Sequence, residues 1–266
     1  MGIIIAVLLF SFIIIFHELG HFLLAKKNGI RVDEFSLGLG PTLLGKQIGE
    51  TKFSLKLLPF GGACMMGEDD ADDLSEGSFN SKSVWARMSV VAAGPIFNLI
   101  LACVFCFILI MITGYRSPEI TGVLDGYSAQ EEGLQAGDVI TEINGRNVHI
   151  WDDVSLYTMT HADEAPFKVE YERDGKKYTA KLEPRQLEGD AAPLLGVTSG
   201  DIVKPGIFKS VEYSIYKVKY WMNYTVDSLR MLVTGQAGLK DLSGPVGIVN
   251  AVETCIRKQL RQGSAL

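Results

Sequence analysis

The sequence predicts an α+β membrane protein with transmembrane helices, a membrane-associated β-hairpin region and one compact, mostly β domain outside the membrane. Residues 2–25 and 90–113 are almost wholly apolar, and each block is long enough to cross a hydrocarbon core of roughly 30 Å as a helix. Strand-like runs separated by glycine and proline lie between the two blocks. After residue 115, short β-type runs alternate with turn signals such as Asp174-Gly175 and Asn144-Gly145.

The first block, residues 1–25, is predicted to be a retained transmembrane helix. A cleaved signal peptide needs a basic segment before its apolar run, whereas no Lys or Arg precedes Lys26. A second transmembrane helix is expected over 85–114. Because cytoplasmic loops are enriched in Lys and Arg, the basic residues between the two spans predict that 26–84 is cytoplasmic. The N-terminus and everything after about residue 115 are then expected outside the cytoplasm.

The cytoplasmic segment is expected to contain a β-hairpin or small sheet attached to the membrane helices. Its runs VDEFSLGLG (32–40) and TKFSLKLLPFGG (51–62) have strand character and are bounded by turn residues. An acidic stretch follows over 67–78. Charge runs of this kind are usually solvated loops, and that interpretation is favoured over a cation site.

Two further segments complete the chain. Residues 115–200 are expected to form the compact β domain, with a short helix at 151–161. Residues 201–266 include an amphipathic pattern over 207–233, whose interspersed charges predict a helix lying on the membrane surface. The net charge of −6 argues against a nucleic-acid partner, which needs a basic footprint. The four cysteines occur in mixed surroundings and are expected to be free thiols.

The first apolar block contains an H-E-x-x-H motif formed by His17, Glu18 and His21. Ionisable groups are costly at membrane depth and are therefore candidates for function. Two imidazoles four residues apart share one helix face and can bind one Zn²⁺. The glutamate between them can act as general base on a water whose pKa the metal lowers towards about 7. The alternative is a pair of core histidines hydrogen-bonded to neighbouring helices.

The membrane setting of this motif predicts a substrate in the membrane. Peptide bonds of a transmembrane helix are hydrogen-bonded internally, so water and a catalyst must be brought to them. The motif is therefore expected to hydrolyse peptide bonds within the bilayer, with transmembrane proteins and the lipid bilayer as partners.

Five stretches of the sequence, taken in order, share a family pattern. They are FHELGHFLLAKKNGIRVDEFSLGLGP (16–41), FSLKLLPFGGACMMGED (53–69), WARMSVVAAGPIFNLILA (85–102), the PDZ-like GYSAQEEGLQAGDVITEINGRNV (126–148) and LSGPVGI (242–248). Together they resemble the site-2 protease family of intramembrane zinc metalloproteases, specifically the bacterial branch containing the regulator of sigma-E protease. The resemblance implies a multi-pass protein of the bacterial inner (plasma) membrane that cleaves transmembrane segments, for example of anti-sigma factors or signal-peptide remnants.

The same resemblance implies roles for individual residues. It makes His17 and His21 zinc ligands and Glu18 the catalytic base. Asn98, in the family's G-P-x-x-N pattern, is expected near the active site to bind substrate or stabilise the oxyanion, which suits an amide donor. A helix-packing hydrogen bond is the alternative for Asn98.

Two other regions acquire expected roles in the same way. The region 32–62 resembles the family's membrane-associated β-region, whose edge can pair with an unwound substrate by strand addition. The PDZ-like domain, expected at 115–200, filters substrates by size or captures a trimmed end in the family. A plain protein-interaction role is the alternative.

One element of the family pattern is missing from the sequence. Family members supply a third zinc ligand, an aspartate in an L-D-G motif on a later transmembrane helix, whereas Leu124-Asp125-Gly126 is a coincidental triplet outside the membrane. Catalytic zinc usually takes three protein ligands and a water, so weak zinc binding is expected. The sequence is expected to be truncated before that motif or to come from a member that no longer cleaves. A membrane-tethered PDZ binding module without activity is the alternative function.

Overall fold

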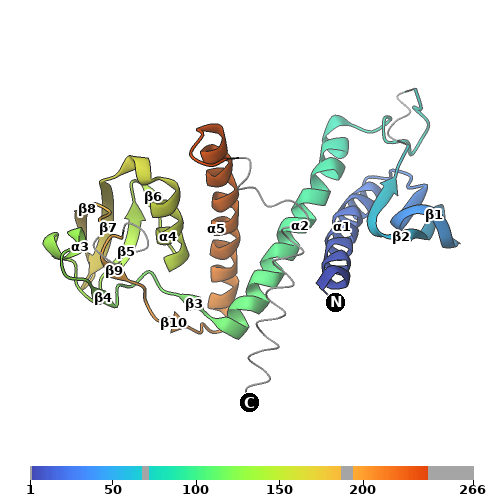
Figure 1. The fold of residues 1–266 in the computed structure, drawn as a ribbon. Helices are drawn as coiled ribbons and strands as arrows, with labels where there is room; N and C mark the ends of the chain where they lie inside the picture. The colour runs from blue at the N-terminus through green and yellow to red at the C-terminus, as the bar shows by residue number, and fades with distance from the viewer. Residues whose placement is uncertain (1, 68–71, 187–193, 239–266) are drawn as a thin grey trace, which may run out of the picture. The chain divides into compact units, whose positions relative to one another are not determined.

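The computed structural model describes residues 2–67, 72–186 and 194–238. These residues divide into two compact units, the first ending at Ala102 and the second beginning at Cys103. Figure 1 shows the helices and strands of both units. The chain is a mixed α/β protein, as predicted, and each unit is described by itself below.

The first unit packs a long helix against a two-stranded sheet and against the start of a second long helix. Its elements are α1 (Gly2–Lys27), β1 (Glu34–Ile48), β2 (Thr51–Met65) and the first part of α2 (Val84–Thr113). Within the described residues, two helices are long and apolar enough to cross a membrane, Ile4–Lys27 and Val84–Thr113. Spans were expected at 1–25 and 85–114, so the helices cover the same two blocks.

Helix α1 ends in a turn that directs the chain into the sheet. Gly29 has a positive φ of 65°, a conformation that glycine adopts without steric cost. The Ile30 N–H donates to the Ala25 carbonyl at 2.9 Å, and the Gly29 N–H donates to the Lys26 carbonyl at 3.1 Å. This pair of bonds is a Schellman motif, which satisfies carbonyls at the helix end. Ile30 is buried as a result and enters the core of the unit.

The two strands of this unit are folded so that the start of β1 lies beside two parts of β2. Phe35 is partnered with both Phe53 and Cys64 across the sheet. The Phe35 and Phe53 rings pack on Phe22 of α1, with ring centroids 5.3 and 5.7 Å from that of Phe22. A core cluster that includes Ala25, Ile30 and Val90 continues this contact. The sheet is therefore held against α1 by aromatic packing.

The second unit is built on an antiparallel four-stranded sheet with the order β6-β5-β7-β8. The strands of this sheet are β5 (Val139–Ile143), β6 (Arg146–Asn147), β7 (Phe167–Arg173) and β8 (Lys176–Leu182). Around it lie α3 (Ser128–Glu131), α4 (Trp151–Thr160), a 3₁₀ turn η1 (Ala162–Glu164) and two short strand pairs, β3 (Tyr115–Arg116) with β10 (Ile202–Val203) and β4 (Gly122–Val123) with β9 (Val197–Thr198). One core of fourteen buried residues, including Ile120, Ile140, Phe167 and Leu182, lies inside this arrangement.

Two hairpin turns of the sheet use the turn signals seen in the sequence. Asn144 and Gly145 join β5 to β6 with φ values of 46° and 85°, and Asp174 and Gly175 join β7 to β8 with 51° and 73°. Positive φ at both central residues defines a type I′ turn, which matches the twist of the flanking strands.

A buried ion pair links the start of β5 to the end of β7. The side chain of Asp138 is 1% exposed, and Arg173 donates to both of its oxygens, at 2.6 Å from Nε and 2.7 Å from a terminal guanidinium nitrogen. The Gln135 N–H donates to Asp138 Oδ2 at 2.8 Å. Burial raises the pKa of the Asp138 carboxyl, but these hydrogen bonds and the Arg173 charge more than offset burial and hold that pKa below its ordinary value.

A long helix, α5 (Ile207–Val233), follows β10 and packs beside α4. Its polar face forms ion pairs with the rest of the unit, Lys217 with Asp152 at 3.0 Å and Asp227 with Arg146 at 2.8 Å. A stripe of apolar side chains on α5 is exposed at helical spacing. It consists of Phe208, Val211, Ile215, Met222, Val226, Leu229 and Val233, and is called the α5 stripe below.

Cys103 and Cys106 are free thiols, as expected. Cys64 and Cys106 are buried and Cys103 is half-buried. The fourth, Cys255, and the stretch 242–248 lie outside the described residues.

Candidate metal centre

The H-E-x-x-H motif lies in the second half of α1, and its two histidines are on the side that packs against α2. His17 and His21 are one turn apart, with ring centroids 4.8 Å from each other and ring planes at 77°. Both rings and the side chain of Glu18 are half-buried. The predicted pair of imidazoles on one helix face is therefore present, and the face is the one that α2 covers.

Each imidazole is held through its Nδ1 atom by a group of α2. His21 Nδ1 lies 2.7 Å from the carbonyl oxygen of Val90. His17 Nδ1 lies 3.1 Å from the side-chain amide of Asn98. Hydrogen bonds of this kind to one ring nitrogen fix the orientation of the ring and leave the other nitrogen to bind a metal. Both rings thus have Nε2 as the nitrogen that remains for a ligand.

The two Nε2 atoms face a common space at Gly94 of α2. A Cβ built on Gly94 would lie 2.5 Å from His17 Nε2 and closer still to His21 Nε2. Zn–N bonds to histidine are about 2.0–2.1 Å long. Both nitrogens therefore face a space that is open only because Gly94 has no Cβ. This space fits a metal ion held by the two rings.

The amide of Asn98 has one atom without a partner. Its Oδ1 is buried and accepts no hydrogen bond from the described residues, while Nδ2 faces His17 Nδ1. Buried polar atoms normally have a partner. A half-turn of the amide would bring Oδ1 against His17 Nδ1 and would release Nδ2.

The side chain of Glu18 lies against the sheet. Its Cγ is 3.3 Å from the position that a Cβ on Gly62 would take. Gly62 belongs to the second half of β2, where it is partnered with Leu37 of β1. The absence of a side chain at Gly62 therefore leaves room for the side chain of Glu18 between α1 and the sheet.

The donor set at this place is incomplete for a catalytic zinc site within the described residues. In residues 2–67, 72–186 and 194–238, no group of three or more His, Cys, Asp or Glu side chains is arranged to hold a metal. Asp125 of the Leu-Asp-Gly triplet is in the second unit, where its Oδ1 accepts a 2.6 Å hydrogen bond from Gln130. Two neutral imidazoles are suitable zinc ligands, so the residues present fit the metal as part of its ligand set.

The four polar side chains of the site are predictable from the sequence, whereas three backbone features are not. These are the Val90 carbonyl that orients His21, the Gly94 backbone that faces both rings, and the Gly62 backbone beside Glu18. Gly94 lies next to Pro95 in the G-P-x-x-N pattern, which was the one signal that pointed to it. A backbone carbonyl carries no such signal, because every residue has one.

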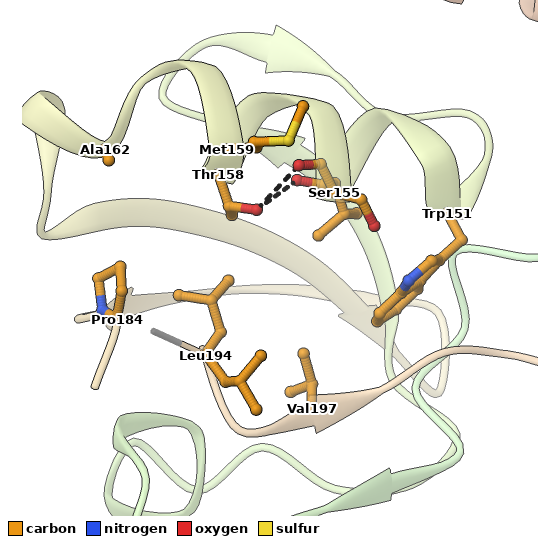
Figure 2. A pocket seen from close by; sticks show the side chains of 10 residues that line it. Trp151, Ser155, Thr158, Met159, Ala162, Pro184, Leu194 and Val197 are labelled. Atoms are coloured by element: carbon orange, nitrogen blue, oxygen red, sulfur yellow. Dashed lines mark hydrogen bonds between the residues drawn. The ribbon is translucent and has the colours of Figure 1, made fainter. Parts of the chain in front are cut away.

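The second unit contains an apolar groove between α4 and the segment that includes β9. It has a volume of about 510 Å³, and the residues that line it include Trp151, Ser155 and Met159 of α4 as well as Leu194 and Val197 (Figure 2). The Leu124 N–H donates to the Gly196 carbonyl, and Val123 is opposite Val197. Bonding residues alternate along an antiparallel strand, so the N–H and carbonyl of Val197 point away from β4. That edge has no strand partner within the described residues.

An H-E-x-x-H helix with oriented imidazoles and an adjacent glutamate defines the class of metal-dependent hydrolases. Comparison with known proteins places the chain within that class. It matches Peptidase family M50 over residues 5–264. The chain belongs to this family, the site-2 metalloproteases, and is a protease, as the sequence predicted.

The relatives of the chain carry matching names. A Clostridium acetobutylicum protein, assigned provisionally as a zinc metalloprotease, is 38% identical over 93% of this chain and 73% of its own length. The regulator of sigma-W protease RasP of Bacillus subtilis is 28% identical over 93% of this chain and 78% of its own. A solved PDZ domain of an SdrC-like protein from Listeria monocytogenes is 24% identical, with a TM-score of 0.26, over 32% of this chain and 88% of that domain.

Proposed function

We propose that this protease is a zinc-dependent endopeptidase that hydrolyses peptide bonds in transmembrane segments of membrane proteins, with His17 and His21 as metal ligands. The observation that carries the proposal is the common space at Gly94 that both Nε2 atoms face. Zinc, when bound, supplies a Lewis acid and lowers the pKa of water to about 7, which makes hydroxide available at neutral pH. Catalytic zinc usually takes three protein ligands and a water, so the two histidines are proposed as part of the ligand set.

Glu18 acts as the general base. Its carboxylate accepts the proton of the attacking water and delivers it to the nitrogen of the scissile amide, so that an amine can leave. Such proton transfer contributes typically about 10²–10⁴-fold to the rate. The room that Gly62 leaves beside Glu18 supports this role, because the Glu18 side chain lies next to the strand at which a substrate can be held.

Asn98 orients His17 in the metal-binding state. A neutral imidazole that binds metal through Nε2 carries its proton on Nδ1 and needs an acceptor there. The half-turn of the Asn98 amide supplies that acceptor from the Oδ1 atom that otherwise has no partner. The released Nδ2 is then free to donate to the substrate carbonyl, which is the oxyanion role expected for Asn98.

The substrate segment is proposed to bind as an extended strand at the second half of β2. Within the described residues, β2 has β1 as its only strand partner, so an edge remains for strand addition. Gly62 on this part of β2 lies beside Glu18. An unwound segment added here passes close to the general base. Membrane proteins of the anti-sigma type are suitable substrates by analogy with the name of the Bacillus subtilis relative.

The protein is proposed to lie in the bacterial inner membrane with its N-terminus and the PDZ-like domain outside the cytoplasm. Two apolar helices and membership in M50 support a membrane location. The basic residues between the helices, such as Lys26, Lys27 and Arg31, support the orientation.

The α5 stripe is proposed to rest on the membrane surface. Phe208 and Val233, near its two ends, are 92% and 87% exposed, whereas the charges of the opposite face pair within the second unit. Cysteine introduced at Met222 should be shielded from a membrane-impermeant maleimide in proteoliposomes, and cysteine at the exposed polar position Lys209 should react. Equal labelling of the two positions would contradict this placement.

The groove of the second unit favours a second role, capture of an extended peptide. The edge of β9 at Val197 offers main-chain hydrogen bonds, and the apolar wall formed by Trp151 and Met159 accepts apolar side chains. Met159→Glu should lower the affinity for an apolar peptide without changing zinc binding. Unchanged peptide binding would show that the groove is not the docking site.

The direct test of the proposed metal site is the zinc content of purified protein at controlled free Zn²⁺. Wild-type protein should bind zinc, and His17→Ala and His21→Ala should each reduce binding strongly. Zinc binding that survives both substitutions together would place the metal elsewhere.

A further inference from the structure

The backbone of Gly94 in α2 faces both imidazoles. The three atoms nearest to a Cβ on Gly94 are His21 Nε2, His17 Nε2 and His17 Cε1. From this geometry we propose that Gly94 is a positioning residue for the metal, because it keeps open the space in which zinc is held. The inference rests on the proposed zinc function of His17 and His21. It adds the requirement of a glycine at position 94, which neither the identity of the ligands nor the H-E-x-x-H motif includes.

The expected displacement of the two ring nitrogens follows from their distances to a Cβ built on Gly94. Cβ contacts shorter than 3.0 Å are essentially never found, and a Cβ at Gly94 would lie 2.5 Å from His17 Nε2 and nearer to His21 Nε2. Each ring nitrogen would therefore have to move by roughly 0.5 Å or more, whereas metal–ligand distances tolerate only about ±0.2 Å. A single methyl group would displace both ligands beyond that tolerance and would also occupy the space between them.

A glycine in a helix can alternatively be required because another backbone packs against it. Gly20 of α1 is such a case, since a Cβ there would lie 2.6 Å from the carbonyl oxygen of Ala93. A carbonyl of a helix cannot move away without shifting the helix. The atoms around Gly94 are instead the ends of imidazole side chains, which can rotate about their own bonds.

Gly20→Ala and Gly94→Ala are therefore predicted to have opposite effects, although both add one methyl group to the same helix pair. Alanine has a higher helix propensity than glycine, so Gly94→Ala should keep or improve the stability of the metal-free fold while the rings turn away. Gly20→Ala should lower that stability, because the methyl group meets backbone.

The experiment compares four proteins: wild type, Gly94→Ala, Gly20→Ala and the double variant His17→Ala/His21→Ala. Zinc affinity is measured by competition with a chelator. Helical content and Tm are measured on the metal-free protein in detergent. Gly94→Ala should bind zinc at least tenfold more weakly than wild type, approaching the double variant. Its helical content should equal that of wild type and its Tm should not fall. Gly20→Ala should show a lowered Tm.

Three other outcomes would contradict either the role of Gly94 or the proposed metal site. Wild-type zinc affinity in Gly94→Ala would overturn the role of Gly94 and leave the proposed function intact. A fall in Tm like that of Gly20→Ala would make Gly94 a packing glycine and would also overturn the inference. Wild-type protein that binds no more zinc than the double histidine variant would overturn the proposed metal site, and the inference about Gly94 with it.

Discussion

Replacing Asn98 by alanine should weaken zinc binding by changing the state of His17. The two imidazoles are oriented differently, His21 by the backbone carbonyl of Val90 and His17 by the side chain of Asn98. Only the second of these supports can be removed by a substitution. In Asn98→Ala, His17 loses its Nδ1 partner, and its ring orientation and the position of its proton are no longer fixed.

The magnitude follows from the kind of contact. A typical neutral hydrogen bond contributes about 0.5–1.5 kcal/mol, and the contact between Asn98 and His17 is 3.1 Å long and partly buried. Loss of a partner that orients a metal ligand typically costs about 10–100-fold in metal affinity. At about 1.4 kcal/mol for each factor of ten, this is roughly 1.4–2.7 kcal/mol. The expected change in the Kd for zinc is therefore one to two orders of magnitude.

The assay is competition for zinc between the purified protein and a chelator of known affinity, with Asn98→Asp as the matched control. A carboxylate at position 98 is an acceptor only, so it can hold the proton of His17 Nδ1 but cannot donate to a substrate. Asn98→Asp should therefore keep zinc affinity near that of wild type and lose most of kcat. If Asn98→Ala binds zinc as tightly as wild type, or Asn98→Asp binds as weakly as Asn98→Ala, the proposed amide orientation is wrong.

Two further predictions concern topology and stability. Alkaline phosphatase fused after residue 76 should be inactive, as expected for a cytoplasmic position, and active when fused after residue 150; the reverse pattern would contradict the proposed orientation. Arg173→Gln should destabilise the second unit by about 3 kcal/mol, because it leaves the buried Asp138 carboxylate without its partner. Since the pKa of Asp138 is lowered in the folded state, the contribution of this pair is present above pH 3.8, the ordinary pKa of the carboxyl, and is lost as pH falls through the lowered value. Urea unfolding at pH 7 and pH 3 measures both effects, and a loss that is the same at both pH values would contradict this account of the pair.

The sequence predicted the elements of this fold whose signals are local. Apolar blocks of helical length predicted α1 and α2, and Asn144-Gly145 and Asp174-Gly175 predicted turns, which the structure shows to be of type I′. The double pairing of Phe35 with Phe53 and Cys64 could not be predicted. It depends on how β1 and β2 fold back on each other and on α1, which local patterns do not encode.

The candidate site was predictable to the extent that its chemistry lies in side chains. The spacing of His17 and His21 sets one helix face, and the structure places that face against α2. The contact of Asn98 with His17 joins residues 81 positions apart, and only the resemblance to the protease family had connected them. The Val90 carbonyl and the glycines at 62 and 94 act through backbone or through a missing side chain, so residue chemistry alone gave no reason to select them.

Glu18 is the proposed base of a zinc-dependent peptidase. The most direct test is cleavage of a transmembrane substrate by the protein in its native membrane, compared between wild type and Glu18→Gln, with zinc content measured on the same preparations. Glu18→Gln should bind as much zinc as wild type, because both histidines remain, and its kcat should fall by about 10²–10⁴-fold. Cleavage at the wild-type rate by a zinc-loaded Glu18→Gln protein would contradict the mechanism.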